Sequence, residues 1–216
     1  MHLISEVQYG AYLAYSPYGT TELAKQSRGI RDALKHDYKG GNPPIQFSEH
    51  IIKELVRERK ELPFQDFFDE NVLLIPIPGS GKTNLESLWP ARRLVQEMEK
   101  KGLGIASTCL RRETGIRKSA YCKAENRPIP KEHFETFSVQ PSVHRPSRIV
   151  LVDDIITRGS TILGAVSKIQ EAFPEVEFFA FAIMRTITGT NDFIHYDEPV
   201  IGRIILRQDG QTWRDP

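Results

Sequence analysis

The chain lacks most of the features that would place it outside the ordinary globular proteins. Only two of its 216 residues are cysteine, which excludes a disulfide framework and fits a reducing compartment. No apolar run approaches the roughly 20 residues that a membrane-spanning helix needs, and the first residues do not resemble a secretory signal. The net charge is only +1, so a general nucleic-acid-binding surface is not indicated. We therefore expect a cytoplasmic globular protein without a membrane partner.

Short apolar runs alternate with amphipathic stretches from about residue 70 onward, and this pattern predicts βαβ units around a parallel sheet. Strands are predicted at 71–78, 104–110, 148–153, 176–184 and 200–206. One helix is predicted at 90–101, because Pro90 opens it and Gly102 follows it. A second helix has an apolar face that runs from Ile162 to Phe173. We expect a single α/β domain over residues 1–216, with a mostly parallel sheet of about five strands flanked by helices.

The two ends of the chain are predicted to elaborate this domain. Residues 1–70 read as helical, with one helix around Leu34 and a second that starts after Ser48 as its N-cap. This segment is too sparsely apolar for a core of its own, so the core is placed at 71–185. Residues 186–216 are predicted to form a cap in which Trp213 would cover neighbouring elements.

The segment at 149–161, IVLVDDIITRGST, carries the clearest chemical signal. Asp153 and Asp154 follow four apolar residues, at the point where a strand would reach the carboxyl edge of the sheet and where ligands bind in open α/β folds. The loop that follows consists of Thr157, Arg158, Gly159, Ser160 and Thr161. It leads into a helix, whose unpaired N–H groups would bind phosphate. Carboxylates beside such a cradle suit the hydroxyl groups of a ribose 5-phosphate. The alternative is a buried strand that ends in solvated aspartates.

This segment resembles the 5-phosphoribosyl-1-pyrophosphate (PRPP) binding signature of the type I phosphoribosyltransferases. With NVLLIPIPGSG, LRRETGIRKS and ENRP upstream, the spacing is similar to the ComF-like branch, and Arg158 resembles the amidophosphoribosyltransferase form of the loop. The resemblance implies the type I phosphoribosyltransferase fold with a variable hood. It implies that Asp153 and Asp154 hold the ribose as catalytic residues, that residues 157–161 bind the 5′-phosphate, and that Mg²⁺ is carried mainly by PRPP without direct protein ligands.

The activity that the resemblance implies is transfer of the phosphoribosyl group from PRPP to a nitrogen nucleophile, a nucleobase or an amine, with release of pyrophosphate. Such a reaction belongs to nucleotide metabolism. Thr157 stands where members specific for 6-oxopurines carry an acid, which argues against hypoxanthine or guanine as the acceptor. The expected partners are PRPP and a small-molecule acceptor, and a homodimer is an open alternative. A second reading keeps the fold but makes the protein a silent PRPP-binding regulator or partner protein.

A second glycine-rich loop follows the strand predicted at 71–78. The resemblance implies that its residues Gly79, Ser80, Gly81 and Lys82 bind pyrophosphate. Backbone N–H groups and the Lys82 ammonium would make the contacts. The same residues suggest a P-loop NTPase, but Pro76 occupies the place of the first glycine and Pro90 interrupts the helix that should follow. An exposed glycine turn is the other alternative.

Residues 111–127 form a basic segment with six cations and two anions. By the resemblance, it would be a mobile loop that closes over pyrophosphate and excludes water. The cations singled out for this role are Arg111, Arg112, Arg117 and Lys118. A solvated loop is the main alternative, and a nucleic-acid contact is not favoured. His133 begins a His-x-Glu motif, but no Cys-x-x-Cys follows, so a deaminase zinc site is discarded.

Overall fold

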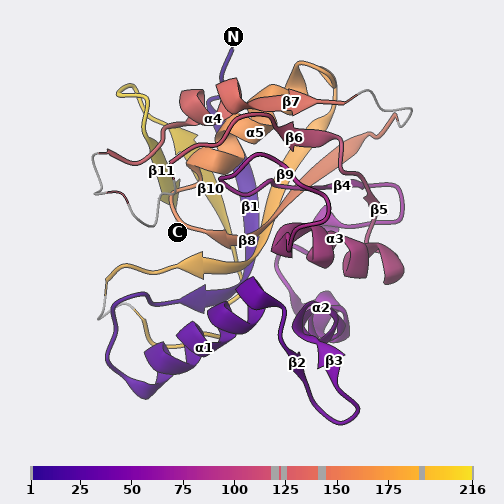
Figure 1. Cartoon of the computed structure of the whole chain (residues 1–216), viewed down its shortest axis with the longest axis vertical. Helices are drawn as coiled ribbons and strands as arrows, with labels where there is room; N and C mark the ends of the chain where they lie inside the picture. The colour runs from indigo at the N-terminus through magenta and orange to yellow at the C-terminus, as the bar shows by residue number, and fades with distance from the viewer. Residues whose placement is uncertain (1, 118–121, 123–125, 141–144, 190–192, 216) are drawn as a thin grey trace.

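The computed structural model describes residues 2–117, 122, 126–140, 145–189 and 193–215, and a seven-stranded sheet forms its centre (Figure 1). The strand order is β11-β10-β1-β9-β8-β4-β5. The strands are β1 (Glu6–Tyr15), β4 (Leu73–Pro76), β5 (Ile105–Ala106), β8 (Arg148–Ile156), β9 (Glu177–Thr186), β10 (Val200–Leu206) and β11 (Thr212–Asp215). Strands β1, β9, β8, β4 and β5 run parallel to one another, whereas β10 and β11 are antiparallel additions at one edge. The expectation of an α/β domain with a mostly parallel sheet is confirmed.

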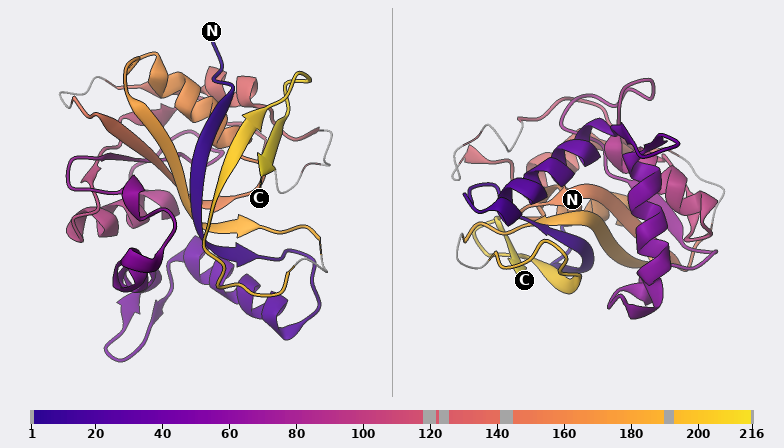
Figure 2. Two further views of the ribbon diagram at one scale, coloured as in Figure 1. Left: turned by 180° about the vertical axis from the view of Figure 1, so that it is seen from behind. Right: turned by 90° about the horizontal axis from the view of Figure 1, so that it is seen from below.

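Helices cover both faces of this twisted sheet (Figure 2). The helices are α1 (Glu22–His36), α2 (Phe47–Glu58), α3 (Pro90–Lys100), α4 (Pro130–Thr136) and α5 (Ser160–Gln170), with short 3₁₀ turns at Arg59–Glu61 and Gln65–Phe67. Two further strand pairs lie outside the central sheet, β2 (Lys39–Gly40) with β3 (Ile45–Gln46) and β6 (Leu110–Arg112) with β7 (Phe137–Val139). Among the described residues, no helix combines the length and apolarity that crossing a bilayer requires.

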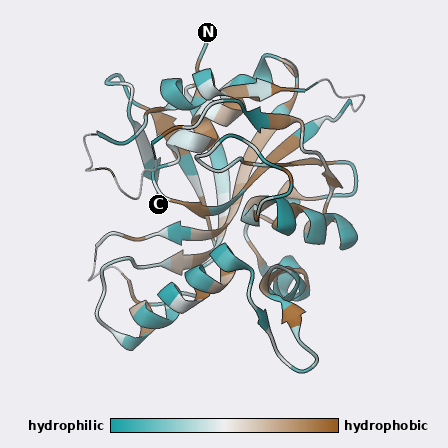
Figure 3. Cartoon of the chain, in the orientation of Figure 1, coloured by the Kyte–Doolittle hydropathy of each residue, from teal (hydrophilic) through white to brown (hydrophobic). Residues whose placement is uncertain are grey.

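The sheet divides the apolar interior into two cores, because alternate residues of a strand face opposite sides. In β8, Val150 and Val152 join a core with α2 and α3, whereas Ile149 and Leu151 join a core with α5. Helix α4 packs on the outside of α5. Figure 3 shows the resulting pattern, with apolar strands at the centre and polar outer faces on the helices.

The structure confirms most elements predicted after residue 70. The strands predicted at 71–78, 148–153, 176–184 and 200–206 correspond to β4, β8, β9 and β10. The helix predicted at 90–101 is α3, which begins at Pro90. The segment 104–110 contributes to two short strands, β5 and β6, that belong to different sheets.

Residues 1–70 are not simply a helical elaboration, because β1 occupies the middle of the sheet between β9 and β10. The sequence analysis missed this strand because its burial comes from pairing with strands that lie far away in the sequence. The predicted N-cap was also wrong by two residues, since α2 starts at Phe47 and its N-cap is Gln46 rather than Ser48. The helix predicted to extend from Ile162 to Phe173 is α5, which is shorter and ends at Gln170.

Residues 200–206 and 212–215 are sheet strands rather than parts of a cap. Antiparallel pairing with β1 places them at the edge of the sheet, and Trp213 is 57% exposed, so it covers little. The element that does lie beyond the carboxyl ends of β1 and β9 is α1 (Figure 1). Thr21 caps this helix by accepting a hydrogen bond from the N–H of Ala24, and the last turn of α1 reaches the end of β8 through Lys35.

Candidate functional site

Two adjacent carboxylates stand near the carboxyl end of β8. The Asp154 N–H donates to Asp153 Oδ1 and the Ile155 N–H donates to Asp154 Oδ1, both at 2.8 Å. Asp154 is buried and Asp153 is partly buried. These local hydrogen bonds fix both side chains at the sheet edge where the sequence placed them.

The carboxylate pair is balanced by one cation from α1. Lys35 Nζ lies 2.6 Å from Asp154 Oδ2. Burial works to lower the pKa of Lys35, but Asp154 and Asp153 outweigh it and leave this pKa above its usual value. Burial and the neighbouring Asp154 charge raise the pKa of Asp153 to about 8. Two adjacent acids with one ammonium contact leave oxygen atoms that can accept further hydrogen bonds or bind a cation.

The loop after β8 has the geometry of an anion site. Gly159 is the N-cap of α5 with φ of 84°, and no side chain caps this helix. Unpaired N–H groups at an uncapped helix start, together with the helix dipole, attract anions. A pocket of about 30 Å³ is present there, lined by residues 157–162 and by Asp153. The five loop residues predicted from the sequence are thus brought together around one small pocket.

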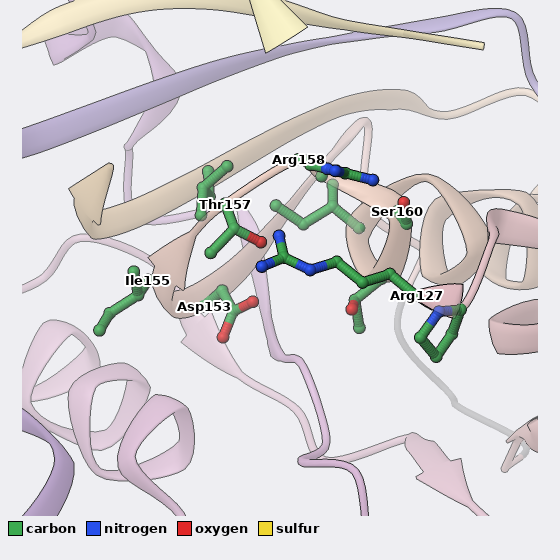
Figure 4. Close-up of a pocket in the computed structure, with 11 residues that line it drawn as sticks. Arg127, Asp153, Ile155, Thr157, Arg158 and Ser160 are labelled. Atoms are coloured by element: carbon green, nitrogen blue, oxygen red, sulfur yellow. The ribbon is translucent and has the colours of Figure 1, made fainter. Parts of the chain in front are cut away.

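Arg127 also lines this pocket, although sequence reasoning did not assign it to the phosphate site. Figure 4 shows its side chain extending across the pocket, with the guanidinium directed toward Thr157 and Asp153. Its Nε is buried and has no hydrogen-bond partner. A guanidinium whose Nε donor is unused suits a phosphate group. The residue belongs to the basic segment, but only its position in the fold identifies this role.

The pocket at the start of α5 adjoins a larger cleft of about 340 Å³. Its walls include Lys35, Asp153, Asp154 and Thr161, and on the opposite side Gly79 and Ser80 from the loop after β4. The other two predicted residues of that loop, Gly81 and Lys82, are exposed and are not among the residues that line the cleft. Residues 77–89 contain no helix, and α3 starts only at Pro90. A P-loop would enter a helix at its Lys-Thr, so this geometry argues against a P-loop NTPase.

The sequence analysis placed Arg112 in a mobile loop, and the structure shows that this is wrong. It lies in β6 and is only 1% exposed. Its Nε donates to the Gly79 carbonyl at 2.6 Å, its Nη1 donates to Thr136 Oγ1, and its guanidinium stacks on the Phe137 ring at 4.1 Å. Burial lowers its pKa to about 10, which still leaves it charged at neutral pH. Arg112 therefore holds the loop after β4 in place from its buried side.

The other predicted loop cations are in different situations. Arg111 pairs with Ser138 within the β6–β7 strand pair, so it too is held in regular structure. Arg117 lines the cleft and forms an ion pair with Glu132, a position that agrees with a contact to a bound anion. Lys118 lies outside the described residues. The prediction of a closing loop is thus limited to residues after 112.

His133 is the third site residue that the sequence analysis did not assign. It is 3% exposed, lines the cleft, and makes contacts at 3.3 Å with both Arg112 Nη2 and Thr161 Oγ1. The sequence analysis missed Lys35, Arg127 and His133 because each comes from a separate part of the chain and no local motif marks it as a site residue. Only the His-x-Glu motif drew attention to His133, and for a different chemistry.

A metal ion would find limited support from the protein alone. Within the described parts of the chain, no group of three or more His, Cys, Asp or Glu side chains could hold a metal. Asp153 and Asp154 nevertheless offer the oxygen ligands that Mg²⁺ prefers, at the wall of the cleft. The donor set therefore fits a magnesium ion that arrives with a phosphorylated ligand and completes its coordination with ligand and water oxygens.

Comparison with known proteins adds no family to these observations. No family model matches the chain, and no curated protein matches it either. The functional interpretation therefore depends on the residues and geometry of the site.

Proposed function

We propose that the chain is a phosphoribosyltransferase of the type I fold that binds PRPP with Mg²⁺ and transfers the phosphoribosyl group to a nitrogen nucleophile. The observation that carries this proposal is the carboxylate pair of β8, which lies between an uncapped helix start and a second loop across one continuous cleft. PRPP has the matching order of groups, with a 5′-phosphate, two ribose hydroxyls and a pyrophosphate.

Each group of the ligand has a complementary partner in the protein. The N–H groups at the start of α5 and the Arg127 guanidinium would bind the 5′-phosphate. Asp153 and Asp154 would accept hydrogen bonds from the ribose hydroxyls, and the latter would exchange its contact with Lys35 for them. The backbone of Gly79 and Ser80, together with Arg117, would bind the pyrophosphate. These contacts hold the ribose so that its C1 faces open space in the cleft.

Catalysis would then depend on positioning and charge stabilisation. As the bond between C1 and the pyrophosphate oxygen breaks, negative charge grows on the leaving group and positive charge grows on the ribose. Arg117 would stabilise the first, and the negative charge that the Asp153–Asp154 pair carries would stabilise the second. Bound Mg²⁺ supplies additional charge neutralisation on the phosphate oxygens. The acceptor nitrogen forms the new bond to C1, and its proton passes to the departing pyrophosphate or to water.

The direct test is ligand-induced stabilisation measured by thermal denaturation with PRPP and Mg²⁺. Ligand at 100 times its Kd should stabilise the wild type by about 2.7 kcal/mol. The variant Asp153→Asn/Asp154→Asn should lose this stabilisation. The variant Glu171→Gln/Glu175→Gln removes two exposed carboxylates just after α5 and should keep it, which controls for the change in net charge.

Two outcomes would contradict the proposal. An absence of any PRPP shift in the wild type would exclude the ligand, and a shift with ATP and Mg²⁺ instead would favour a nucleotide-binding loop. Turnover is measured separately as pyrophosphate release in the presence of amine and nucleobase acceptors. Steady release supports the transferase, whereas tight PRPP binding without release from any acceptor supports the silent binding protein.

A further inference from the structure

Three buried or partly buried side chains form a continuous chain of contacts between the two sides of the cleft. Arg112 Nη2 lies 3.3 Å from His133 Nδ1, and His133 Nε2 lies 3.3 Å from Thr161 Oγ1. The residues come from β6, α4 and α5, and Arg112 and His133 are 1% and 3% exposed. Arg112 also binds the Gly79 carbonyl, so the chain of contacts joins the loop after β4 to the phosphate loop.

The direction of each hydrogen bond follows from the chemistry of the groups. An arginine side chain only donates, so His133 Nδ1 must be the acceptor of the bond from Arg112. A neutral imidazole carries one proton, which is then on Nε2, and Nε2 must donate to Thr161 Oγ1. Burial and the charge of Arg112 lower the pKa of His133 to about 3, which keeps the ring neutral at physiological pH.

The consequence concerns the hydroxyl proton of Thr161. A threonine in a helix often donates this proton to a backbone carbonyl of the preceding turn. Here Oγ1 accepts a bond from His133, and Thr161 lines both the phosphate pocket and the larger cleft. We propose that His133 is a positioning residue that holds Thr161 so that its hydroxyl donates to a phosphate oxygen of the bound ligand. This inference rests on the proposed PRPP site.

Close packing of α4 against α5 supports the assignment. A Cβ added to Gly164 would lie 2.6 Å from the Pro130 carbonyl oxygen and 2.8 Å from His133 Cβ. Only glycine therefore lets α4 approach closely enough for His133 to reach Thr161. The His133 ring also stacks on Phe137 at 6.4 Å with an interplanar angle of 23°, which fixes its orientation. A histidine with a purely structural role would need the bond to Arg112 but not the bond to Thr161.

Two substitutions of similar size separate these roles. In His133→Gln, the side-chain amide can place an N–H donor near the position of Nε2 and keep the bond to Thr161. In His133→Asn, the shorter amide can accept from Arg112 near the position of Nδ1 but cannot reach Thr161. We expect the Kd for PRPP with Mg²⁺, measured by calorimetry, to rise about tenfold in His133→Asn and to stay within about twofold of wild type in His133→Gln.

A double-mutant cycle with Thr161→Val tests the coupling. Thr161→Val alone should weaken PRPP binding about tenfold, and adding His133→Asn should weaken it no further, because the hydroxyl that His133 positions is already gone. Circular dichroism and thermal denaturation establish that each variant is folded before its Kd is measured. Thr161→Ser keeps the hydroxyl and provides a folded control in which His133→Asn should again cost about tenfold.

The outcomes distinguish this inference from the proposed function. If the wild type does not bind PRPP, both are overturned. If the wild type binds and the two substitutions weaken binding independently, to about a hundredfold in the double variant, His133 does not act through Thr161. Wild-type affinity in His133→Asn, or equal losses in His133→Asn and His133→Gln, would also overturn the positioning role while leaving the PRPP site intact.

Discussion

Residues 157–161 follow β8 and residues 77–89 follow β4, and these neighbouring parallel strands bring both loops to the same sheet edge. The first loop is short, enters a helix directly, and is tightly packed against β10. The second is long, contains no helix, and is exposed at Gly79, Gly81, Lys82 and residues 84–88. It is attached to the domain from behind through Arg112. A rigid loop suits a group that stays bound through the reaction, and a looser loop suits a group that must leave.

The largest expected difference between the loops is their tolerance of a single methyl group. In Gly159→Ala, the new Cβ would lie 2.6 Å from Ile204 Cγ2, and the residue would keep a φ of 84°. Left-handed backbone strain and overpacking together should reduce the free energy of unfolding by about 2–4 kcal/mol and abolish PRPP stabilisation. Urea denaturation with and without PRPP measures both effects.

Gly79→Ala is the matched substitution in the second loop. No atom lies within 4 Å of the added Cβ, so the free energy of unfolding should change by no more than about 0.5 kcal/mol. Equal losses in the two variants would show that the loops are equally rigid and would contradict the contrast between them.

Site residues that are contiguous in the sequence could be predicted, whereas those that come from separate elements could not. Asp153, Asp154 and the loop at 157–161 are contiguous, so a local pattern contains the whole arrangement and the structure brings it together as expected. Lys35, Arg127 and His133 reach the cleft from separate elements. Their positions are set by the packing of α1 at the sheet edge and of α4 on α5, which no local pattern encodes.

Strand β1 illustrates the same limit for the fold. Its sequence, EVQYGAYLAY, mixes small, polar and aromatic residues, so hydrophobicity alone does not mark a central strand. Gly10 is required because Phe64 packs directly against it, with a Cβ added there lying 2.8 Å from Phe64 Cβ. By contrast, β8 contains the apolar run at 149–152, and such runs are recognisable because both faces of a parallel sheet are covered.

The two loops also differ in charge, because the end of β8 carries the acids Asp153 and Asp154. The pKa of Asp153 is raised to about 8, whereas the unfolded chain ionises it near pH 4. Between these values, the unfolded state releases a proton that the folded state keeps, so folding stability falls as pH rises. Asp153→Asn removes this loss and should stabilise the ligand-free protein by several kcal/mol at pH 8, with no gain at pH 4.

Denaturation curves of both proteins from pH 4 to 9 would measure this difference. Glu175→Gln, which removes one exposed carboxylate, should follow the wild type throughout this range. Parallel stability profiles for wild type and Asp153→Asn would show that Asp153 ionises normally. The same variant should bind PRPP more weakly, so that greater stability accompanies weaker ligand binding at this position.

The smallest effect is expected at Lys35, which connects α1 to the end of β8. Its ion pair with Asp154 is partly exposed, with 45% of the lysine side chain accessible, so Lys35→Met should cost only about 0.5 kcal/mol of stability. Its electrostatic effect should be clearer. Without the ammonium, the acid pair loses the positive charge that holds the pKa of Asp153 down, so this pKa rises further. In Lys35→Met, the pH range over which folding stability falls should therefore extend to higher pH than in the wild type.

Lys53→Met isolates this electrostatic effect. Lys53 pairs with Glu49 at 2.7 Å, and its side chain is 44% accessible, which matches Lys35 in distance and exposure but not in its neighbours. Both variants should lose a similar small amount of stability at pH 7, yet only Lys35→Met should shift the pH profile, because only Lys35 lowers the pKa of Asp153. An identical pH profile in the two variants would mean that Asp153 does not sense α1. Helix α1 would then lie beside the cleft without influencing the ionisation of Asp153.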